Sequence, residues 1–399
     1  MDITIQPCSL RGEVTVIPSK SQAHRLLICA AFADAPTQLH CPETNRDIEA
    51  TADCLRALGT EILHTESGYS VFPISTPPDQ AVLNCCESGS TLRFLLPIVG
   101  ALGVDAIFKM EGRLPQRPLS PLWEEMERMG CKLRFISDKE LLCESQLRPG
   151  DYCIDGGVSS QFITGLLFAL SLLDGDSSIR ITGKLESKPY VEMTIQAMAQ
   201  YGVYVEGFRV KGGKTYRSPG KLTVEGDWSN GAFWLAANAL GSDIKVLNLD
   251  PNSAQGDRTV VEILNQLNTG TPTISATDIP DLIPILSVIA AGRQGASFTD
   301  IRRLRLKESD RVASTIALLE ALGGKADATA DTLIVYPAPF SGGTVDAVND
   351  HRIAMAAAIA ATCCAEPVTI LGAECVKKSY PKFWEEYARL GGNYEFHLR

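Results

Sequence analysis

Hydrophobic and polar residues along the chain form two alternating kinds of helical pattern, each usually followed by a short strand-like run. The first kind is amphipathic and ends in glycine, as in Leu319-Glu-Ala-Leu-Gly323. Glycine takes the left-handed conformation that closes a helix at little cost, so each such glycine predicts a helix C-terminus. The glycines in question are Gly59, Gly130, Gly202, Gly270, Gly323 and Gly391. The copy before Gly270 matches the pattern least well.

The second helical pattern is rich in Ala and Leu and has little polar surface. Helices of this kind begin near Arg25, Leu92, Phe162, Ala232, Leu282 and Arg352. Both series recur every roughly 70 residues, and both are shorter by roughly 15 to 20 residues between Gly270 and Gly323. Two independent series with one period predict six repeat units of βαβαββ type, of which the fourth is shortened.

Helices as apolar as those of the second series must be buried on nearly all sides. They would then lie inside a layer of sheets, with the amphipathic helices packed inward beside them and the strands outward. A chain of 399 residues corresponds to about two domains of ordinary size, so each domain would hold three units. The pattern thus predicts a two-domain inside-out α/β barrel with buried helices and outward-facing sheets.

Composition narrows the class of protein further. Hydrophobic residues make up 45% of the chain and charged residues 21%, which excludes intrinsic disorder. No window approaches the roughly 18 apolar residues of a membrane span, and the first residues lack the pattern of a signal peptide. We therefore expect a cytoplasmic protein that has no membrane partner.

The charge of the chain and its Cys and His residues limit its partners and cofactors. A net charge of −10 disfavours nucleic acid, because such binding is driven by Lys and Arg that neutralise phosphates. The 12 Cys and five His lack the spacing of metal ligands, so we expect reduced thiols and no metal. Any phosphate that the protein binds should be small and held in a local basic pocket.

A polar motif precedes each apolar helix. The motifs are residues 18–25, 87–93, 157–161, 225–229, 277–281 and 349–352. Their Ser, Thr and Asp residues suit helix N-caps, which could by itself explain any one motif. Cations also stand in these first turns, at Lys20, Arg25, Arg93 and Arg352. A cation there is unfavourable unless an anion is bound, so the helix N-termini together predict an anion site.

Two further segments carry charge in an unusual setting. Residues 307–311 place Lys, Glu, Asp and Arg within one short run before a helix. A solvated helix start is the commoner explanation, but an acid between two cations suits proton transfer beside phosphate ligands. Arg117 precedes a proline and therefore has extended backbone, from which its guanidinium can clamp a phosphate or carboxylate.

Ten short motifs occur in order between about residues 5 and 385. They are Pro18-Ser-Lys-Ser21, Gly89-Ser-Thr-Leu-Arg93, Arg117-Pro118, Ser159-Ser-Gln-Phe-Ile-Thr164, Ser187-Lys-Pro-Tyr190, Glu225-Gly-Asp227, Asp278-Ile-Pro-Asp281, Lys307-Glu-Ser-Asp-Arg311, Asp350-His-Arg352 and Lys378-Ser-Tyr-Pro381. Each is weak alone, but together they resemble the 5-enolpyruvylshikimate-3-phosphate (EPSP) synthase family. That family's fold of two domains with three βαβαββ units each agrees with the repeat found independently. The resemblance also implies domains of residues 20–225 and of residues 1–19 with 226–399.

The resemblance implies transfer of the enolpyruvyl group of phosphoenolpyruvate (PEP) to the 5-hydroxyl of shikimate 3-phosphate, with release of phosphate. The reaction serves aromatic amino acid (chorismate) biosynthesis and needs no cofactor or metal. The residues at positions that bind shikimate 3-phosphate are Lys20, Ser21, Arg25, Ser159, Ser160, Gln161, Ser187, Tyr190, Asp281 and Lys307. Those at positions that bind PEP are Lys20, Gly89, Arg117, Gln161, Arg311, Arg352 and Lys378. Lys20, Asp281 and Glu308 match the catalytic residues, and the resemblance further implies a monomer that glyphosate inhibits.

The sequence departs from the family pattern at three places. Glu87 stands where the family often has Asn beside the PEP site, and Arg303 where an uncharged residue is common. These two charges could offset one another. The shortened fourth unit, at residues 256–278, is expected to lack a surface hairpin or a helix turn and to leave the site intact.

Two other functions fit parts of this pattern. UDP-N-acetylglucosamine enolpyruvyl transferase shares the fold and the chemistry, but the motifs at Lys307 and Ser159 argue against it. A catalytically silent relative acting as a binding protein should have lost Lys20, Asp281, Glu308 or an arginine of the site, and none of these is missing.

Overall fold

The computed structural model describes residues 1–397, and the chain divides into two compact units. The terminal unit consists of Met1–Ile17 and the chain from Gly226 on, and the central unit is Pro18–Glu225. The chain therefore begins in the terminal unit, passes through the whole central unit and ends in the terminal unit. The boundaries expected from the sequence lie within two residues of these positions.

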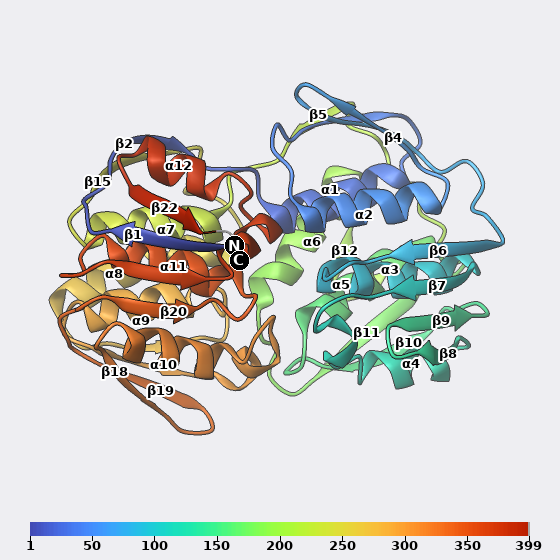
Figure 1. Ribbon diagram of the computed structural model, residues 1–399. Coiled ribbons are helices and arrows are strands. Elements are labelled where there is room, and N and C mark those ends of the chain that lie inside the picture. Colours follow the sequence, from blue (N-terminus) through green and yellow to red (C-terminus); the bar gives the residue numbers. More distant parts are fainter. Residues whose placement is uncertain (398–399) are drawn as a thin grey trace. The chain divides into compact units, whose positions relative to one another are not determined.

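Three apolar helices form the core of the central unit (Figure 1). They are α1 (Lys20–Ala31), α3 (Gly89–Leu102) and α5 (Ser160–Leu172). The amphipathic helices are α2 (Arg46–Ala57), α4 (Leu122–Arg128) and α6 (Lys188–Gln200), and the 3₁₀ helix η1 spans Leu114–Gln116. Helices α3 and α5 pack so closely that a Cβ on Gly165 would overlap the carbonyl oxygen of Arg93. Glycine is therefore required at this crossing.

Three four-stranded sheets lie outside these helices. The first contains β14 (Lys221–Thr223), β3 (Thr37–His40), β5 (Gly68–Phe72) and β4 (Glu61–Thr65). The second contains β6 (Gln80–Asn84), β7 (Asp105–Lys109), β9 (Glu140–Glu144) and β8 (Lys132–Ser137). The third contains β10 (Asp151–Asp155), β11 (Ser177–Thr182), β13 (Arg209–Val210) and β12 (Val205–Glu206).

Each of these sheets has one pattern. Its first two strands are parallel, and its last two form an antiparallel hairpin. Buried and exposed residues alternate along the strands, so that one face packs on the helices. In the β6–β7 pair, for example, Leu83 lies opposite Phe108, and both are fully buried.

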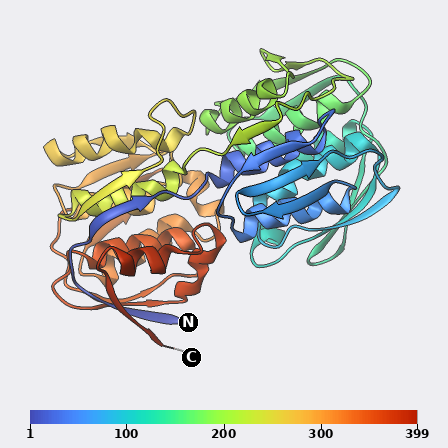
Figure 2. The same cartoon turned by 90° about the horizontal axis from the view of Figure 1, so that it is seen from above.

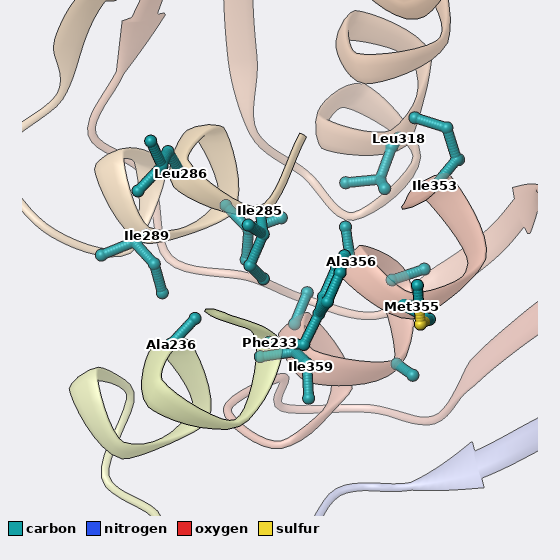
Figure 3. Close-up of a cluster of buried hydrophobic side chains, with 14 of the residues drawn as sticks. Phe233, Ala236, Ile285, Leu286, Ile289, Leu318, Ile353, Met355, Ala356 and Ile359 are labelled. Carbon is teal, nitrogen blue, oxygen red and sulfur yellow. The ribbon is translucent and has the colours of Figure 1, made fainter. Parts of the chain in front are cut away.

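The terminal unit repeats this plan around α7 (Trp228–Ala239), α9 (Ile283–Ala291) and α11 (His351–Ala361), which Figure 2 shows from above. Its other helices are α8 (Val260–Thr269), α10 (Arg311–Ala321) and α12 (Phe383–Arg389). The 3₁₀ helices are η2 (Gly256–Thr259), η3 (Arg302–Leu306) and η4 (Ala373–Lys378). Side chains from the buried helices meet in one cluster, with Phe233, Ile285 and Ile359 near its centre (Figure 3).

Two sheets of the terminal unit are four-stranded and one has only two strands. The first contains β20 (Gly343–Asp346), β21 (Val368–Leu371), β1 (Asp2–Gln6) and β22 (Asn393–His397). The second contains β16 (Thr273–Ser275), β17 (Ala296–Thr299), β19 (Thr332–Tyr336) and β18 (Lys325–Ala328). The two-stranded sheet pairs β15 (Asp243–Leu247) with β2 (Arg11–Thr15) in parallel.

The two-stranded sheet belongs to the shortened fourth unit. Helix α8 leads directly to β16, so the missing element is the antiparallel hairpin rather than a helix turn. Among the residues that the structure describes, the loss leaves one edge of β15 without a partner strand. The side-chain amide of Asn238 replaces that partner, because it donates to the carbonyl oxygen of Ile244 and accepts from its N–H, both at 2.8 Å.

The inside-out α/β fold expected from the repeats is confirmed in both units. Five of the six predicted helix-ending glycines have the expected positive φ. Gly270 does not, because its φ of 179° is extended backbone that any residue adopts. Within residues 1–397, no helix is long and apolar enough to cross a membrane.

Candidate active site

Side chains of the polar motifs cap the N-termini of five of the six buried helices. Ser19, Ser88, Ser159, Asp227 and Asp350 each accept a hydrogen bond from a backbone N–H of the first turn. N-capping is therefore correct for five motifs. Helix α9 begins after Leu282 without a side-chain cap, so the Asp278–Asp281 motif serves another purpose.

Two guanidinium groups lie against the N-terminus of α3 in the central unit. A Cβ on Gly89 would stand 2.7 Å from Arg117 Nη1 and 2.9 Å from Arg93 Nη1. Arg93 also donates to Gln161 Oε1 at 2.9 Å, and Gln161 Nε2 donates to Ser90 Oγ at 3.0 Å. The first turns of α3 and α5 are thus joined at a basic site, and glycine at position 89 makes room for it.

The basic residues of α1 are held by neighbouring helices. Lys20 Nζ lies 2.9 Å from Asp47 Oδ2 of α2. Arg25, which is 2% exposed, donates to Thr194 Oγ1 at 2.9 Å and to the carbonyl oxygen of Tyr190 at 2.8 Å, and also to that of Ser21. Burial lowers the pKa of Arg25 to about 10. Arg25 therefore ties the first turn of α1 to the first turn of α6.

The serines predicted to bind shikimate 3-phosphate lie at three helix N-termini: Ser21 is the second residue of α1, and the others stand at the start of α5 and α6. Ser159 caps α5, where its Oγ accepts from the N–H of Gln161 at 3.3 Å, and Ser160 is the first residue of that helix. Ser187 precedes α6 with a left-handed φ of 54°, which costs a non-glycine residue about 1–2 kcal/mol. Such strain is commonest at functional sites.

Arg311 is the centre of the predicted site in the terminal unit. It is 1% exposed and bonds to Asp281 at 2.5 Å, Glu308 at 2.6 Å and Asp350 at 2.9 Å. Burial alone would lower its pKa, but these three carboxylates hold the pKa of Arg311 well above its usual value. The loop before α9, the segment after η3 and the N-terminus of α11 are thereby joined.

Asp281 is surrounded by cations. Besides Arg311, Lys307 Nζ and Arg352 Nη2 each lie 3.5 Å from its carboxylate. Partial burial raises the pKa of Asp281, but the three cations outweigh this effect and hold it well below the usual value. Burial also lowers the pKa of Lys307 to about 8, although Asp281 opposes the shift. Asp281 is therefore ionised at neutral pH.

Two more predicted cations are positioned by backbone carbonyls. Arg352 Nη1 donates to the carbonyl oxygen of Ser229 at 3.2 Å, which joins α11 to the first turn of α7. Lys378 Nζ donates to the carbonyl oxygen of Asn349 at 2.8 Å. The structure therefore brings Asp281, Lys307, Arg311 and Arg352 into contact in the terminal unit, with Lys378 bound to the loop before α11.

The residues that hold these side chains carry little signal in the sequence. Asp47 pairs with Lys20, Ser309 donates to Asp350 at 2.9 Å, and Asp257 binds Ser229. Asp47 lies in an ordinary first helical turn and Asp257 in a loop-like Gln-Gly-Asp segment, so neither stood out. Ser309 and Asp350 lie within recognised motifs, so these two could have been found from their positions.

The two unusual charges lie in different units. The Glu87 carboxylate packs against Gly112, where a Cβ would stand 2.5 Å from Oε2. Arg303 Nη2 donates to the carbonyl oxygen of Thr277 at 3.4 Å. Whether these charges offset one another stays a prediction.

Comparison with known proteins decides the family. The family profile described as EPSP synthase (3-phosphoshikimate 1-carboxyvinyltransferase) matches residues 5–387, which include every predicted site residue. The chain belongs to this family of transferases. The 3-phosphoshikimate 1-carboxyvinyltransferase of Clostridium kluyveri is 40% identical over 418 residues, covering 98% of this chain and 97% of the relative. The enzyme of Clostridium beijerinckii is 37% identical, covering 99% and 98%.

Solved structures agree with the EPSP synthase fold. An EPSP synthase from Acinetobacter baumannii matches with a TM-score of 0.80 at 24% identity, covering 99% of this chain and all of that one. The enolpyruvyl transferase NikO from Streptomyces tendae matches with a TM-score of 0.78 at 18% identity, covering 99% and 98%. At such identities the likeness shows the fold alone.

Proposed function

We propose that this chain transfers the enolpyruvyl group of PEP to the 5-hydroxyl of shikimate 3-phosphate and releases phosphate, a step of aromatic amino acid biosynthesis. The observation that carries this proposal is the ionised Asp281 held among Lys307, Arg311 and Arg352. A carboxylate beside three cations suits a hydroxyl that must be activated next to anionic groups. Family membership supplies the identity of the two substrates.

The substrates together carry two phosphates and a carboxylate, which require several cations. We assign shikimate 3-phosphate to Lys20, Ser21, Arg25, Ser159, Ser160, Gln161, Ser187, Tyr190, Asp281 and Lys307. We assign PEP to Lys20, Gly89, Arg117, Gln161, Arg311, Arg352 and Lys378.

The reaction has an addition and an elimination step. In the addition, the 5-oxygen of shikimate 3-phosphate forms a bond to C2 of PEP, the hydroxyl loses its proton, and C3 gains one. In the elimination, the bond from C2 to the phosphate oxygen breaks and C3 loses a proton, which restores the double bond. Atoms balance as EPSP and inorganic phosphate.

Asp281 and Glu308 would take the two proton-transfer roles. Without bound substrate, Asp281 is a weak base, because the neighbouring Lys307, Arg311 and Arg352 lower its pKa. Substrate anions that engage these cations would raise the pKa of Asp281 and make it a better base for the hydroxyl. Glu308, bonded to Arg311, would serve C3, while Lys20 would stabilise charge on the departing phosphate. We also expect a monomer that glyphosate inhibits in competition with PEP.

Phosphate release from PEP tests the proposal, with shikimate 3-phosphate and with shikimate as acceptors. We expect release that depends on shikimate 3-phosphate and is much slower with shikimate, since shikimate lacks the 3-phosphate. Asp281→Asn should lose at least about 100-fold in kcat, the low end for a general base. The matched control is Asp243→Asn, an exposed residue of β15. Equal release with both acceptors, or an active Asp281→Asn variant, would contradict the assignment.

A further inference from the structure

A buried carboxylate that the proposed mechanism leaves unused lies behind Arg352. Asp257 of η2 is 1% exposed. Its Oδ2 accepts a hydrogen bond from Ser229 Oγ, and its Oδ1 is buried with no hydrogen-bond partner among residues 1–397. The carbonyl oxygen of the same Ser229 accepts from Arg352 Nη1 at 3.2 Å. One residue of α7 therefore connects Asp257 to a cation assigned to PEP.

Asp350 shows which donors a buried carboxylate paired with a cation receives in this unit. It is 0% exposed, and its Oδ2 accepts from Ser309 Oγ and Arg311 Nε, both at 2.9 Å. Its Oδ1 accepts from the backbone N–H of Arg352 at 3.0 Å. A buried charge needs several donors of this kind. Asp257 has one neutral hydroxyl instead, so its surroundings favour the protonated carboxyl.

The charges that face Asp257 come from three other elements. Asp281, before α9, and Asp227, the N-cap of α7, disfavour a further negative charge, whereas Arg352 of α11 favours it. Burial is the largest effect on the pKa of Asp257 and Asp281 is the next, and both raise it. Arg352 and the hydrogen bond from Ser229 lower the pKa, but the balance still leaves it raised to about 7. Asp257 can therefore exchange a proton near neutral pH.

We propose that Asp257 is a positioning residue that binds a proton when an anionic substrate group binds Arg352. The inference rests on the proposed function, which gives Arg352 its anion. The positive charge of Arg352 favours the ionised form of Asp257, and an anion bound to Arg352 offsets that charge. Binding of the anion therefore favours binding of a proton to Asp257. By linkage the reverse also holds, and loss of the proton from Asp257 weakens the binding of PEP.

The test compares the KM for PEP in wild type and in Asp257→Asn, at saturating shikimate 3-phosphate, from about pH 6 to about pH 9. Asparagine imitates the neutral carboxyl and still accepts from Ser229, so the variant should lack the rise in KM that ionisation of Asp257 causes. We expect the ratio of wild-type to variant KM to grow about threefold or more over this range. Such a rise is within the limit for one linked proton, which changes affinity by at most about tenfold per pH unit. Lys307, with a pKa of about 8, titrates in both proteins, so its effect on KM largely cancels in the ratio.

A second variant, Ser229→Ala, tests in which direction the pH of the rise in KM moves. The hydrogen bond from Ser229 lowers the pKa of Asp257, so Ser229→Ala should move the rise in KM to higher pH. The exposed control Asp243→Asn should keep the wild-type profile. A purely structural role for Asp257 would change stability, measured by thermal unfolding, without moving the profile.

The outcomes separate the two claims. A constant KM ratio across the pH range, in an active wild type, would overturn the inference and leave the proposed function standing. A folded Asp257→Asn variant with a higher KM than wild type at every pH would show that the ionised carboxylate is needed, which also overturns it. A wild type that releases no phosphate from PEP in the presence of shikimate 3-phosphate would overturn the proposed function itself.

Discussion

Replacement of Gly89 by alanine perturbs the basic site at the N-terminus of α3 by a single methyl group. The new Cβ would lie 2.7 Å from Arg117 Nη1 and 2.9 Å from Arg93 Nη1, whereas ordinary contacts begin at 3.4 Å. Arg117 must therefore move by about 0.7 Å (3.4 − 2.7), and Arg93 by about 0.5 Å (3.4 − 2.9). Arg93 resists this movement, because it donates to Gln161 and to the carbonyl oxygen of Pro118.

The size of the effect follows from the contacts at stake. A hydrogen bond to a charged group contributes about 1.5–3 kcal/mol, so misplacing one on PEP raises KM about tenfold to a hundredfold. Folding should suffer little, because the clash involves the ends of flexible side chains. Alanine is also favoured over glycine in a helix by about 1 kcal/mol. Gly89→Ala should thus bind PEP poorly while its thermal unfolding temperature stays near that of wild type.

The assay measures KM for PEP, the inhibition constant of glyphosate and thermal unfolding in wild type and Gly89→Ala. Because glyphosate is the longer ligand, we expect its inhibition to weaken more than PEP binding. Gly270→Ala is the matched control, since its backbone is extended and nothing lies within 4 Å of the added Cβ. If Gly89→Ala keeps the wild-type KM and glyphosate inhibition, Gly89 and Arg117 do not line the PEP site, and the reasoning fails.

Three further predictions concern other parts of the chain. Lys20→Met should fold and lose at least about 100-fold in kcat, and a variant that keeps a tenth of wild-type turnover would contradict its role on phosphate. His24 is buried, and burial, Lys20 and Arg25 hold its pKa well below 6.5. Between pH 6.5 and pH 5.5, His24 therefore takes up a proton in the unfolded chain but not in the folded protein. Over this range the free energy of unfolding, measured in urea, should fall by about 1 kcal/mol more in wild type than in His24→Gln. Equal losses would mean that His24 also titrates in the folded protein. Asn238→Ala removes both bonds to Ile244 and should cost about 1–3 kcal/mol in urea unfolding and expose the edge of β15 to self-association. The exposed control Asn268→Ala should do neither.

The repeat could be predicted because each unit carries its own local signals. An apolar helix, a polar N-cap and a closing glycine are properties of neighbouring residues, and they recur at one period. Gly270 ends α8 as predicted, but it does so without the expected left-handed conformation. A helix-ending glycine usually leads into a hairpin, but here α8 leads directly to β16 and Gly270 stays extended.

The contacts between repeats could not be predicted in this way. Arg25 reaches Tyr190, and Arg311 reaches Asp350, across long stretches of sequence. Nothing in the local pattern around Asp257 marks it as the partner of Ser229. Gly89 was recognised through the family motif, but the arginines that occupy the space of its missing Cβ emerge only from the fold. The sequence thus predicted a set of candidate ligands, which stay predictions, and indicated little of what positions their side chains.

The origin of the oxygen in the released phosphate tests the proposed transfer most directly. PEP labelled with a heavy isotope in its bridging oxygen is mixed with shikimate 3-phosphate and the wild-type protein, and phosphate and organic products are analysed by mass spectrometry. Addition and elimination break the bond between C2 and that oxygen, so the label should leave with phosphate, and shikimate 3-phosphate should gain a carboxyvinyl group. Unlabelled phosphate together with labelled pyruvate would mean that the protein cleaves the phosphorus–oxygen bond of PEP, which would contradict the proposed function.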